Sequence, residues 1–186
     1  MSHWQILDYA KNDQEIISSV IEVFTGVYQT YFVNELLVNH NLPIEIRAFR
    51  QTDIWHIFLL LTPWTLARVF LPVRDPGLEI PPGWQAQERA TAPMTVIGPA
   101  MPLAILGGKE QAHLNYHPKL GHYLIQPLIQ SMAQFNTSDE AFKAWNEVIK
   151  IRDKAIEEQK KRCEWQHEVS RREFFAKLTR RASLKH

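Results

Sequence analysis

Three histidines close together are the first residues whose types and spacing could do chemistry: His113, His117 and His122. Imidazole nitrogens bind zinc, and His113 and His117 would lie on one face of a strand, because residues an even number of positions apart share a face. Their spacing fits no ligand motif, and Glu110 is the nearest carboxylate in the sequence. We therefore expect polar positions on a half-exposed hairpin, with no bound metal and no cofactor.

Nucleophilic chemistry has one candidate, the lone Cys163, which follows three cations at 160–162 that could lower the pKa of its thiol. A His and an acid positioned to activate it cannot be read from the sequence. The sequence also has no glycine-rich phosphate loop, no GxSxG elbow and no HExxH. We expect a protein that is not an enzyme. A single cysteine also fits a reducing cytoplasm.

Aromatic residues next to predicted strands favour a binding role. Trp55, Trp64 and Trp84 lie on or beside the strands and the loop that follows them. Pro63 cannot donate a backbone hydrogen bond to a sheet, so Thr62, Pro63 and Trp64 mark the end of a strand. Trp64 then lies at a corner, where it faces either a groove or the core, and core packing is the commoner role. Clustered aromatics beside a sheet edge suit the capture of an extended or helical peptide.

The first element that must position these residues is an amphipathic helix. Apolar residues recur at spacings of three and four over residues 13–37, which predicts one buried face. Asn12 followed by Glu15 has the character of a capping box and places the helix start. Pro43 then favours an extended conformation at the residue before it, which breaks the helix.

The middle of the chain predicts a mainly antiparallel sheet. Ile44, Ile46 and Ala48 alternate with polar residues, as on a strand with one buried face. β-branched and aromatic runs on both sides of the Thr-Pro-Trp corner, before a Pro-rich loop, predict two more strands. Further along the chain, short strands are expected at residues 94–97, 103–106, 112–116 and 122–125. Gly107-Gly108 and Gly121 are the expected turns between them.

A long basic helix is predicted to close the chain, starting at a capping box formed by Thr137 and Glu140. Residues 150–186 hold twelve Lys/Arg against six Asp/Glu, a net charge of +6, whereas residues 1–149 hold nine against fourteen, a net charge of −5. The predicted class is α+β: an N-terminal amphipathic helix, a mainly antiparallel sheet and a long C-terminal helix with a basic tail. We expect a single domain over 1–156 and a basic helical extension over 157–186. The longest apolar run, 57–61, is too short to cross a membrane.

At "IFLLLTPWTLARVFLP" the sequence resembles the HybE/HupJ family of [NiFe]-hydrogenase assembly chaperones. The family pattern is an apolar run, Thr-Pro-Trp, a second apolar run ending in Leu-Pro, and then a Trp, which here is Trp84. The stretches "NHNLPIEIRAF" and "GHYLIQPLIQSMAQF" are similar to the flanking parts of the pattern. The resemblance covers about residues 16–150. Near residues 125–131 the Ser/Cys-rich character expected from the family is replaced by "IQPLIQS", and the rubredoxin domain of some relatives is absent.

The resemblance implies a cytoplasmic maturation chaperone that binds a hydrogenase precursor before export. The expected client is the small-subunit precursor with its twin-arginine signal; the large subunit and other maturation factors are further expected partners, and nucleic acid is not. Such a client needs a groove for an apolar segment, for which the candidates are Trp55, Thr62, Pro63, Trp64, Trp84 and Tyr123. It also needs carboxylates to receive two guanidiniums, for which the candidates are Asp53, Asp75, Glu79 and Glu88.

The tail itself contains a sequence like a twin-arginine signal, "SRREFF", formed by Ser170, Arg171, Arg172, Glu173, Phe174 and Phe175. It is C-terminal and no apolar run follows, so it is not an export address. One interpretation is the end of a basic helix. The other is that the tail imitates the client's motif in a groove of its own chain or of a second copy, which would make a homo-oligomer. An alternative function is an adaptor that binds membranes or nucleic acid through the basic tail.

Overall fold

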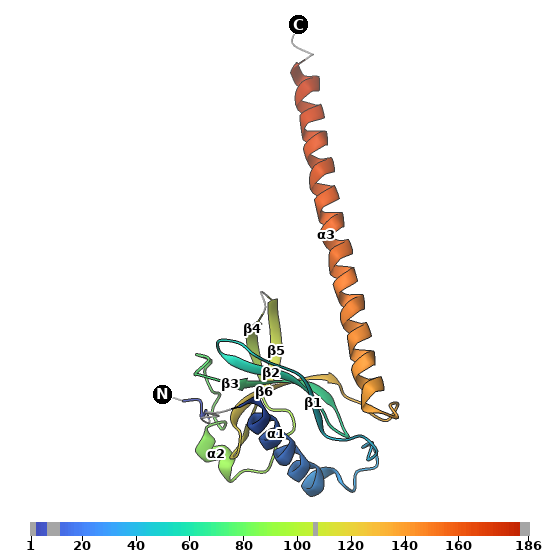
Figure 1. Ribbon diagram of the computed structural model, residues 1–186. Helices are drawn as coiled ribbons and strands as arrows, with labels where there is room; N and C mark the ends of the chain where they lie inside the picture. Colours follow the sequence, from blue (N-terminus) through green and yellow to red (C-terminus); the bar gives the residue numbers. More distant parts are fainter. Residues whose placement is uncertain (1–2, 7–11, 106–107, 183–186) are drawn as a thin grey trace. The chain divides into compact units, whose positions relative to one another are not determined.

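The structure is a computed structural model that describes residues 3–6, 12–105 and 108–182, without the side chains at 104–105, 108–109 and 162–182. The chain divides into two compact units, Met1–Ala141 and Phe142–His186. The predicted α+β class is confirmed, because an N-terminal helix is followed by a six-stranded antiparallel sheet and a long C-terminal helix (Figure 1).

All six strands belong to one sheet with the order β1-β2-β3-β6-β5-β4. In chain order they are β1 (Glu45–Gln51), β2 (Trp55–Leu61), β3 (Leu66–Pro72), β4 (Ala100–Ile105), β5 (Gly108–His117) and β6 (Gly121–Ile129). Gly121 has a φ of 68°, which explains a glycine at the predicted turn before β6. The strand predicted at 94–97 is wrong. The side-chain amide of Asn115 donates to the Val96 carbonyl at 3.0 Å and holds this segment as a loop.

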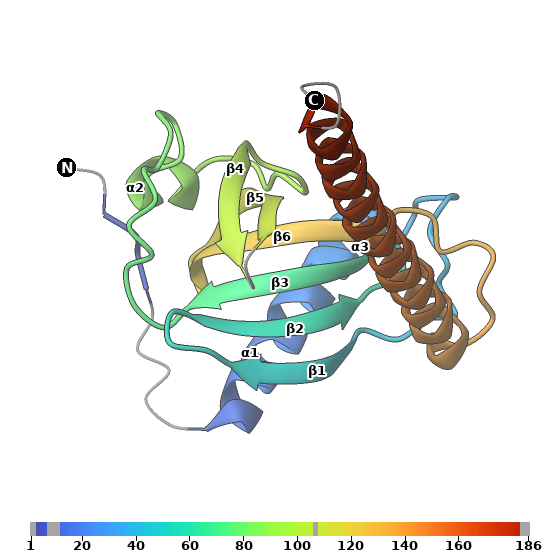
Figure 2. The ribbon, with the colours of Figure 1, turned by 90° about the horizontal axis from the view of Figure 1, so that it is seen from above.

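One face of the sheet is covered by α1 (Asp13–Val27), which runs across the strands (Figure 2). The predicted cap is present, since Asn12 Oδ1 accepts a hydrogen bond from the Gln14 N–H at 2.6 Å. A π-helical turn, η1 (Tyr28–Phe32), continues α1, and turns follow it. The predicted helix end at residue 37 is therefore wrong, because the chain turns after Phe32, where the Glu35 N–H bonds the Phe32 carbonyl.

Two hydrophobic clusters cover the two faces of the sheet because side chains alternate along each strand. On β2, Phe58 and Leu60 join the cluster under α1, whereas Trp55 and Ile57 join the opposite cluster. The opposite cluster is completed by the N-terminal Trp4 and by the loop after β3. Each of these β2 residues therefore packs in the cluster on its own face of the sheet.

The alternation predicted for β1 is interrupted at Ala48. Between Arg47 and Arg50 the register shifts by one extra residue, a β-bulge, and Ala48 has a φ of 55°. A left-handed conformation costs an L-residue about 1–2 kcal/mol, whereas glycine adopts it freely. The bulge bends this edge strand and hinders pairing with another chain.

We expect Ala48→Gly to raise the free energy of unfolding by about 1 kcal/mol, because it removes this strain. Urea unfolding followed by circular dichroism measures the change. Ala67→Gly on β3 is the matched control, since Ala67 is fully buried in a central strand and its replacement should destabilise the protein. A loss of stability in Ala48→Gly would contradict the bulge geometry.

The C-terminal helix α3 (Ser138–Ala182) begins at its predicted cap. The Glu140 N–H donates to Thr137 Oγ1 at 3.3 Å, and the Glu140 carboxylate accepts from the Asn136 N–H at 2.8 Å. Among the helices that the structure describes, none is long and apolar enough to span a membrane.

Candidate functional site

The Thr-Pro-Trp corner between β2 and β3 is a turn closed by two buried threonines. Thr62 Oγ1 accepts from the Thr65 N–H and donates to the Thr65 carbonyl, both at 3.0 Å. The Thr65 hydroxyl donates in turn to the Ile129 carbonyl at 2.8 Å and ties the corner to β6. Pro63 fits the second position of such a turn because its φ is fixed. The corner therefore holds Trp64 on a rigid support.

Trp64 is half-buried on the face of the sheet that α1 covers. Its ring stacks on Phe32 with centroids 4.2 Å apart and planes inclined by 8°, and it lies parallel to Tyr28 at 6.4 Å. Phe24, Tyr28 and Phe32 are four residues apart, so they form one aromatic stripe along α1 and η1. Trp64 thus serves the core, as the commoner interpretation predicted, but it also has a second surface.

That second surface lines a small pocket of about 200 Å³, here called the Trp64 pocket. Its lining is mostly apolar and consists of Trp64, Thr65, Val96, Ile97, Ile125, Pro127 and Gln130. Val96 and Ile97 are 38% and 45% exposed, so the pocket is bordered by accessible apolar side chains. A preformed apolar pocket of this size is suited to one large apolar side chain of a partner.

Asn39 supports the corner, a role that the sequence did not reveal. Its side-chain amide donates to the carbonyls of Met132 and Phe135 at 3.0 and 2.6 Å, and its backbone N–H donates to the Pro63 carbonyl at 2.9 Å. The sequence signal was limited to the turn-forming composition of "NHNLP", because the two carbonyls that the Asn39 amide bonds lie more than ninety positions away.

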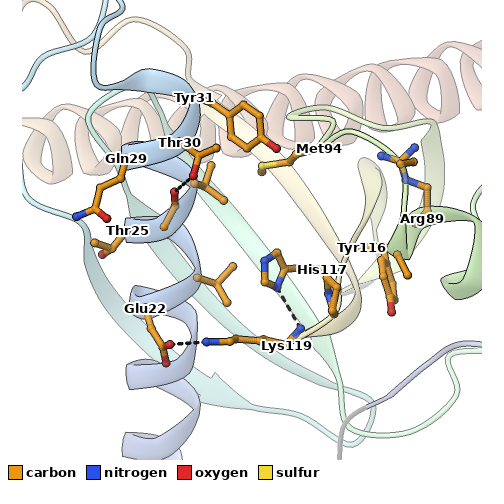
Figure 3. A pocket seen from close by; sticks show the side chains of 16 residues that line it. Glu22, Thr25, Gln29, Thr30, Tyr31, Arg89, Met94, Tyr116, His117 and Lys119 are labelled. Atoms are coloured by element: carbon orange, nitrogen blue, oxygen red, sulfur yellow. Dashed lines mark hydrogen bonds and ion pairs between the residues drawn. The ribbon is translucent and has the colours of Figure 1, made fainter.

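A second and larger pocket, here called the α1 pocket, has a volume of about 630 Å³ (Figure 3). One wall is the last part of α1 with η1; the others are the turn between β5 and β6 and the segment that includes α2 (Ala86–Ala90). Tyr31 and Met94 line this pocket next to Phe32 and Val96, which belong to the surroundings of Trp64. The 94–97 loop therefore contributes lining residues to both pockets.

Charged groups surround the α1 pocket. Glu22 and Lys119 form an ion pair across it, and the hydrogen bond and charge of Lys119 lower the pKa of the Glu22 carboxyl. Burial, with the nearby Lys119 charge, lowers the pKa of His117, whose Nδ1 accepts from the Lys119 N–H at 3.1 Å. Arg89 lies 4.6 Å over the Trp84 ring and donates to the Pro93 carbonyl.

The structure places two predicted groove residues, Trp55 and Trp84, in the cluster on the other face of the sheet from Trp64. Trp55 is buried on the opposite face, edge-on to Trp4 at 5.9 Å and to Phe70 at 6.1 Å. Trp84 is half-buried against that same cluster. Tyr123 shares the α1 face with Trp64 but is almost fully buried, and burial raises the pKa of its hydroxyl. The six residues do not line one groove.

Asp53, the first of the four predicted arginine acceptors, also lies away from Trp64. Asp53 is paired with Arg74 at the end of the sheet where β2 begins, while Trp64 follows the end of that strand. The seven residues of β2 put roughly 20 Å between these ends.

The four predicted acceptor carboxylates differ in the hydrogen bonds and ion pairs that they already make. Asp75 accepts from the Gly77 N–H at 2.8 Å, and Glu88 caps α2 by accepting from the Gln85 N–H at 2.9 Å. Glu79 is exposed and, within the described part of the chain, makes no hydrogen bond or ion pair. Glu79 is thus the most available acceptor of the four.

The three histidines have separate surroundings. His113 Nδ1 lies 2.8 Å from the Gly98 carbonyl, and His117 lines the α1 pocket. His122 is fully buried: its Nδ1 accepts from the Gln5 N–H at 2.8 Å and its Nε2 lies 2.9 Å from the Trp84 carbonyl. This arrangement requires the neutral ring with its proton on Nε2. Among the side chains that the structure describes, no three of His, Cys, Asp or Glu are grouped to hold a metal.

Stability should fall as the pH drops below about 6.5, because burial lowers the pKa of His122 in the folded protein. The unfolded chain then binds a proton that the folded protein resists, at a cost of up to ~1.4 kcal/mol per pH unit. His56 and His117 shift in the same direction and add to the slope.

Urea unfolding between about pH 7.5 and pH 5.5 measures this dependence. His122→Gln is the matched variant, since an amide can keep both hydrogen bonds but does not titrate; its stability should depend less on pH. An equal slope in both proteins would show that His122 is not held neutral.

The twin-arginine-like residues 170–175 and Cys163 lie within α3, and their side chains are outside the described part of the structure.

A half-buried Trp on a hydrogen-bonded corner, with an apolar pocket beside it, is a feature suited to a protein that binds a partner. The family model of the [NiFe]-hydrogenase assembly chaperone HybE matches residues 15–177, and the chain belongs to this family. The solution structure of HybE from Escherichia coli is similar with a TM-score of 0.47 and 14% sequence identity, covering 72% of this chain and 74% of that one. No curated protein sequence matches the chain. The predicted resemblance is thereby confirmed, and the family assigns the chain to the [NiFe]-hydrogenase assembly chaperones.

Proposed function

We propose that this assembly chaperone binds the small-subunit precursor of a [NiFe] hydrogenase through its twin-arginine signal, in the cytoplasm and before export. The observation that carries the proposal is the Trp64 pocket: an apolar site on a locked turn, bordered by exposed Val96 and Ile97. Such a site receives one apolar anchor residue of an unfolded segment. A few buried aromatic contacts commonly supply most of the binding energy of an interface.

The two arginines of the signal would pair with carboxylates outside this pocket, with Glu79 as the first candidate. An extended peptide advances roughly 3.3 Å per residue, so about six to eight residues cover the length of β2. The apolar anchor and the arginines would then contact opposite ends of the sheet. Bidentate Arg–carboxylate pairs add selectivity for arginine over lysine.

We expect Trp64→Ala to weaken the binding of a synthetic twin-arginine signal peptide by at least about tenfold, measured by isothermal titration calorimetry. Because Trp64 also stacks on Phe32, this variant will lose stability as well. Ile97→Ser is the matched variant, since Ile97 is 45% exposed and its change leaves the core intact. It should weaken binding while the thermal unfolding temperature stays within a few degrees. Unchanged affinity in both variants would exclude the Trp64 pocket, and no binding by the unmodified chain would exclude this client.

A further inference from the structure

The α1 pocket has more cationic than anionic groups. Arg89 and Lys119 line it, and Glu22 is the one carboxylate among its lining residues that the structure describes. Lys119 uses one N–H of its ammonium group on Glu22, so two N–H donors remain. His117 accepts at Nδ1, which places the proton of the neutral ring on Nε2 as a further donor.

The wall formed by α1 carries two features that are unfavourable for a helix. Gly26 lies inside the helix, where glycine costs about 1 kcal/mol relative to alanine. The π-helical turn of η1 follows directly, and such turns are frequent at functional sites. A Cβ built on Gly26 would meet no atom within 4 Å, so the glycine is not required by packing and leaves the pocket open.

We propose that the α1 pocket binds a peptide segment carrying a carboxylate, with the Lys119 ammonium and His117 Nε2–H as its hydrogen-bond donors. The proposal rests on the proposed function in that the occupant is part of a polypeptide client. A volume of about 630 Å³ exceeds the needs of one side chain and admits a short stretch of peptide. Val23 and Val27 form an apolar floor that suits the residues flanking the acid.

The charges oppose the alternative occupant, the paired arginines of the client. An arginine entering the pocket would find Glu22 already neutralised by Lys119 and would approach the guanidinium of Arg89. A carboxylate would instead compete with Glu22 for Lys119. The two occupants therefore predict opposite effects when Glu22 loses its charge.

Three acetylated and amidated pentapeptides test the proposal on the full chain: GLELG, GLQLG and GLRLG. Their affinities are measured by NMR titration, following the amides of residues 22–31 and 116–119. We expect GLELG to bind about tenfold more tightly than GLQLG, the usual gain of a charge-assisted hydrogen bond, and GLRLG to bind most weakly. Equal affinities of GLELG and GLQLG, or a preference for GLRLG, would overturn the proposal.

Variants of the pocket sharpen the result. Glu22→Gln should tighten GLELG about threefold by removing the competing carboxylate, and Lys119→Gln should weaken it. Gly26→Leu should abolish binding by filling the space, whereas Gly26→Ala should keep the fold and most of the binding. If Gly26→Leu fails to fold, the exposed Glu22 and Lys119 variants still decide the outcome. Tighter binding of GLRLG than of GLELG, lost in Glu22→Gln, would assign the pocket to cations.

The failure of this proposal is distinguishable from the failure of the proposed function. Ile97 does not line the α1 pocket and its change leaves the core intact, so Ile97→Ser should bind GLELG as the unmodified chain does. If the signal peptide does not bind but the preference for GLELG is intact, only the proposed function of the Trp64 pocket is contradicted. If the signal peptide binds but GLELG is not preferred, only the proposal for the α1 pocket is contradicted.

Discussion

Replacing Asn39 by alanine should lower the free energy of unfolding by about 3 kcal/mol. The side chain makes three hydrogen bonds: it donates to the Met132 and Phe135 carbonyls and accepts from the Asn41 N–H at 3.2 Å. Each such bond contributes about 1 kcal/mol, and the two carbonyls are left in part-buried surroundings without their donor. Urea unfolding gives the difference directly.

Asn41→Ala is the control for this prediction, because Asn41 is exposed and lies in the same turn. Its effect should stay within about 0.5 kcal/mol. Asn39 also bonds the Pro63 carbonyl through its backbone, so a loosened turn in Asn39→Ala should reduce signal-peptide affinity as well. An Asn39→Ala protein as stable as the unmodified chain would show that this side chain does not connect the two turns.

Replacing Trp4 by alanine should cost about 4 kcal/mol, the usual loss for a buried Trp. Trp4 is 6% exposed, lies edge-on to Trp55 and His122, and donates its indole N–H to the Leu78 carbonyl at 2.7 Å. Trp4 precedes residues 15–177, which the family model matches, so its contribution to the free energy of unfolding comes from outside the matched part of the chain.

Trp4→Phe separates the two contributions of the indole, since it keeps most of the ring contact and loses the hydrogen bond. It should cost only about 1–2 kcal/mol. The alanine variant should also free Gln5 from His122, and the pKa of His122 should then move back towards its ordinary value; NMR titration of the ring detects this. Unchanged stability and an unchanged His122 pKa would contradict the packing of residues 4–6 against the hydrophobic cluster on the face of the sheet opposite α1.

Local signals predicted most of the secondary structure because the forces that set it act over a few residues. Asn12 and Thr137 start helices through hydrogen bonds to N–H groups two or three positions away. The prediction failed where a distant group intervened. The 94–97 segment has the composition of a strand, but Asn115 holds its carbonyl and makes it a loop.

The candidate site was predictable only in part. The Thr-Pro-Trp corner follows from the missing donor of Pro63, and its family pattern indicated an assembly chaperone, which the family match confirms. The four expected acceptor carboxylates are close to the Trp residues in sequence, yet in the structure Asp53 and Trp64 lie near opposite ends of β2.

The sequence by itself determined the α+β class, the family and the position of the corner, because each depends on neighbouring residues or on a short pattern. Only the tertiary structure decided which aromatics act together. A strand's alternation says that Trp55 and Phe58 face opposite ways, but not what covers each face. The α1 pocket likewise exists because folding brings Gly26, Met94 and His117 together around one space. These residues are far apart in the sequence, so no local pattern predicts that they line the same pocket.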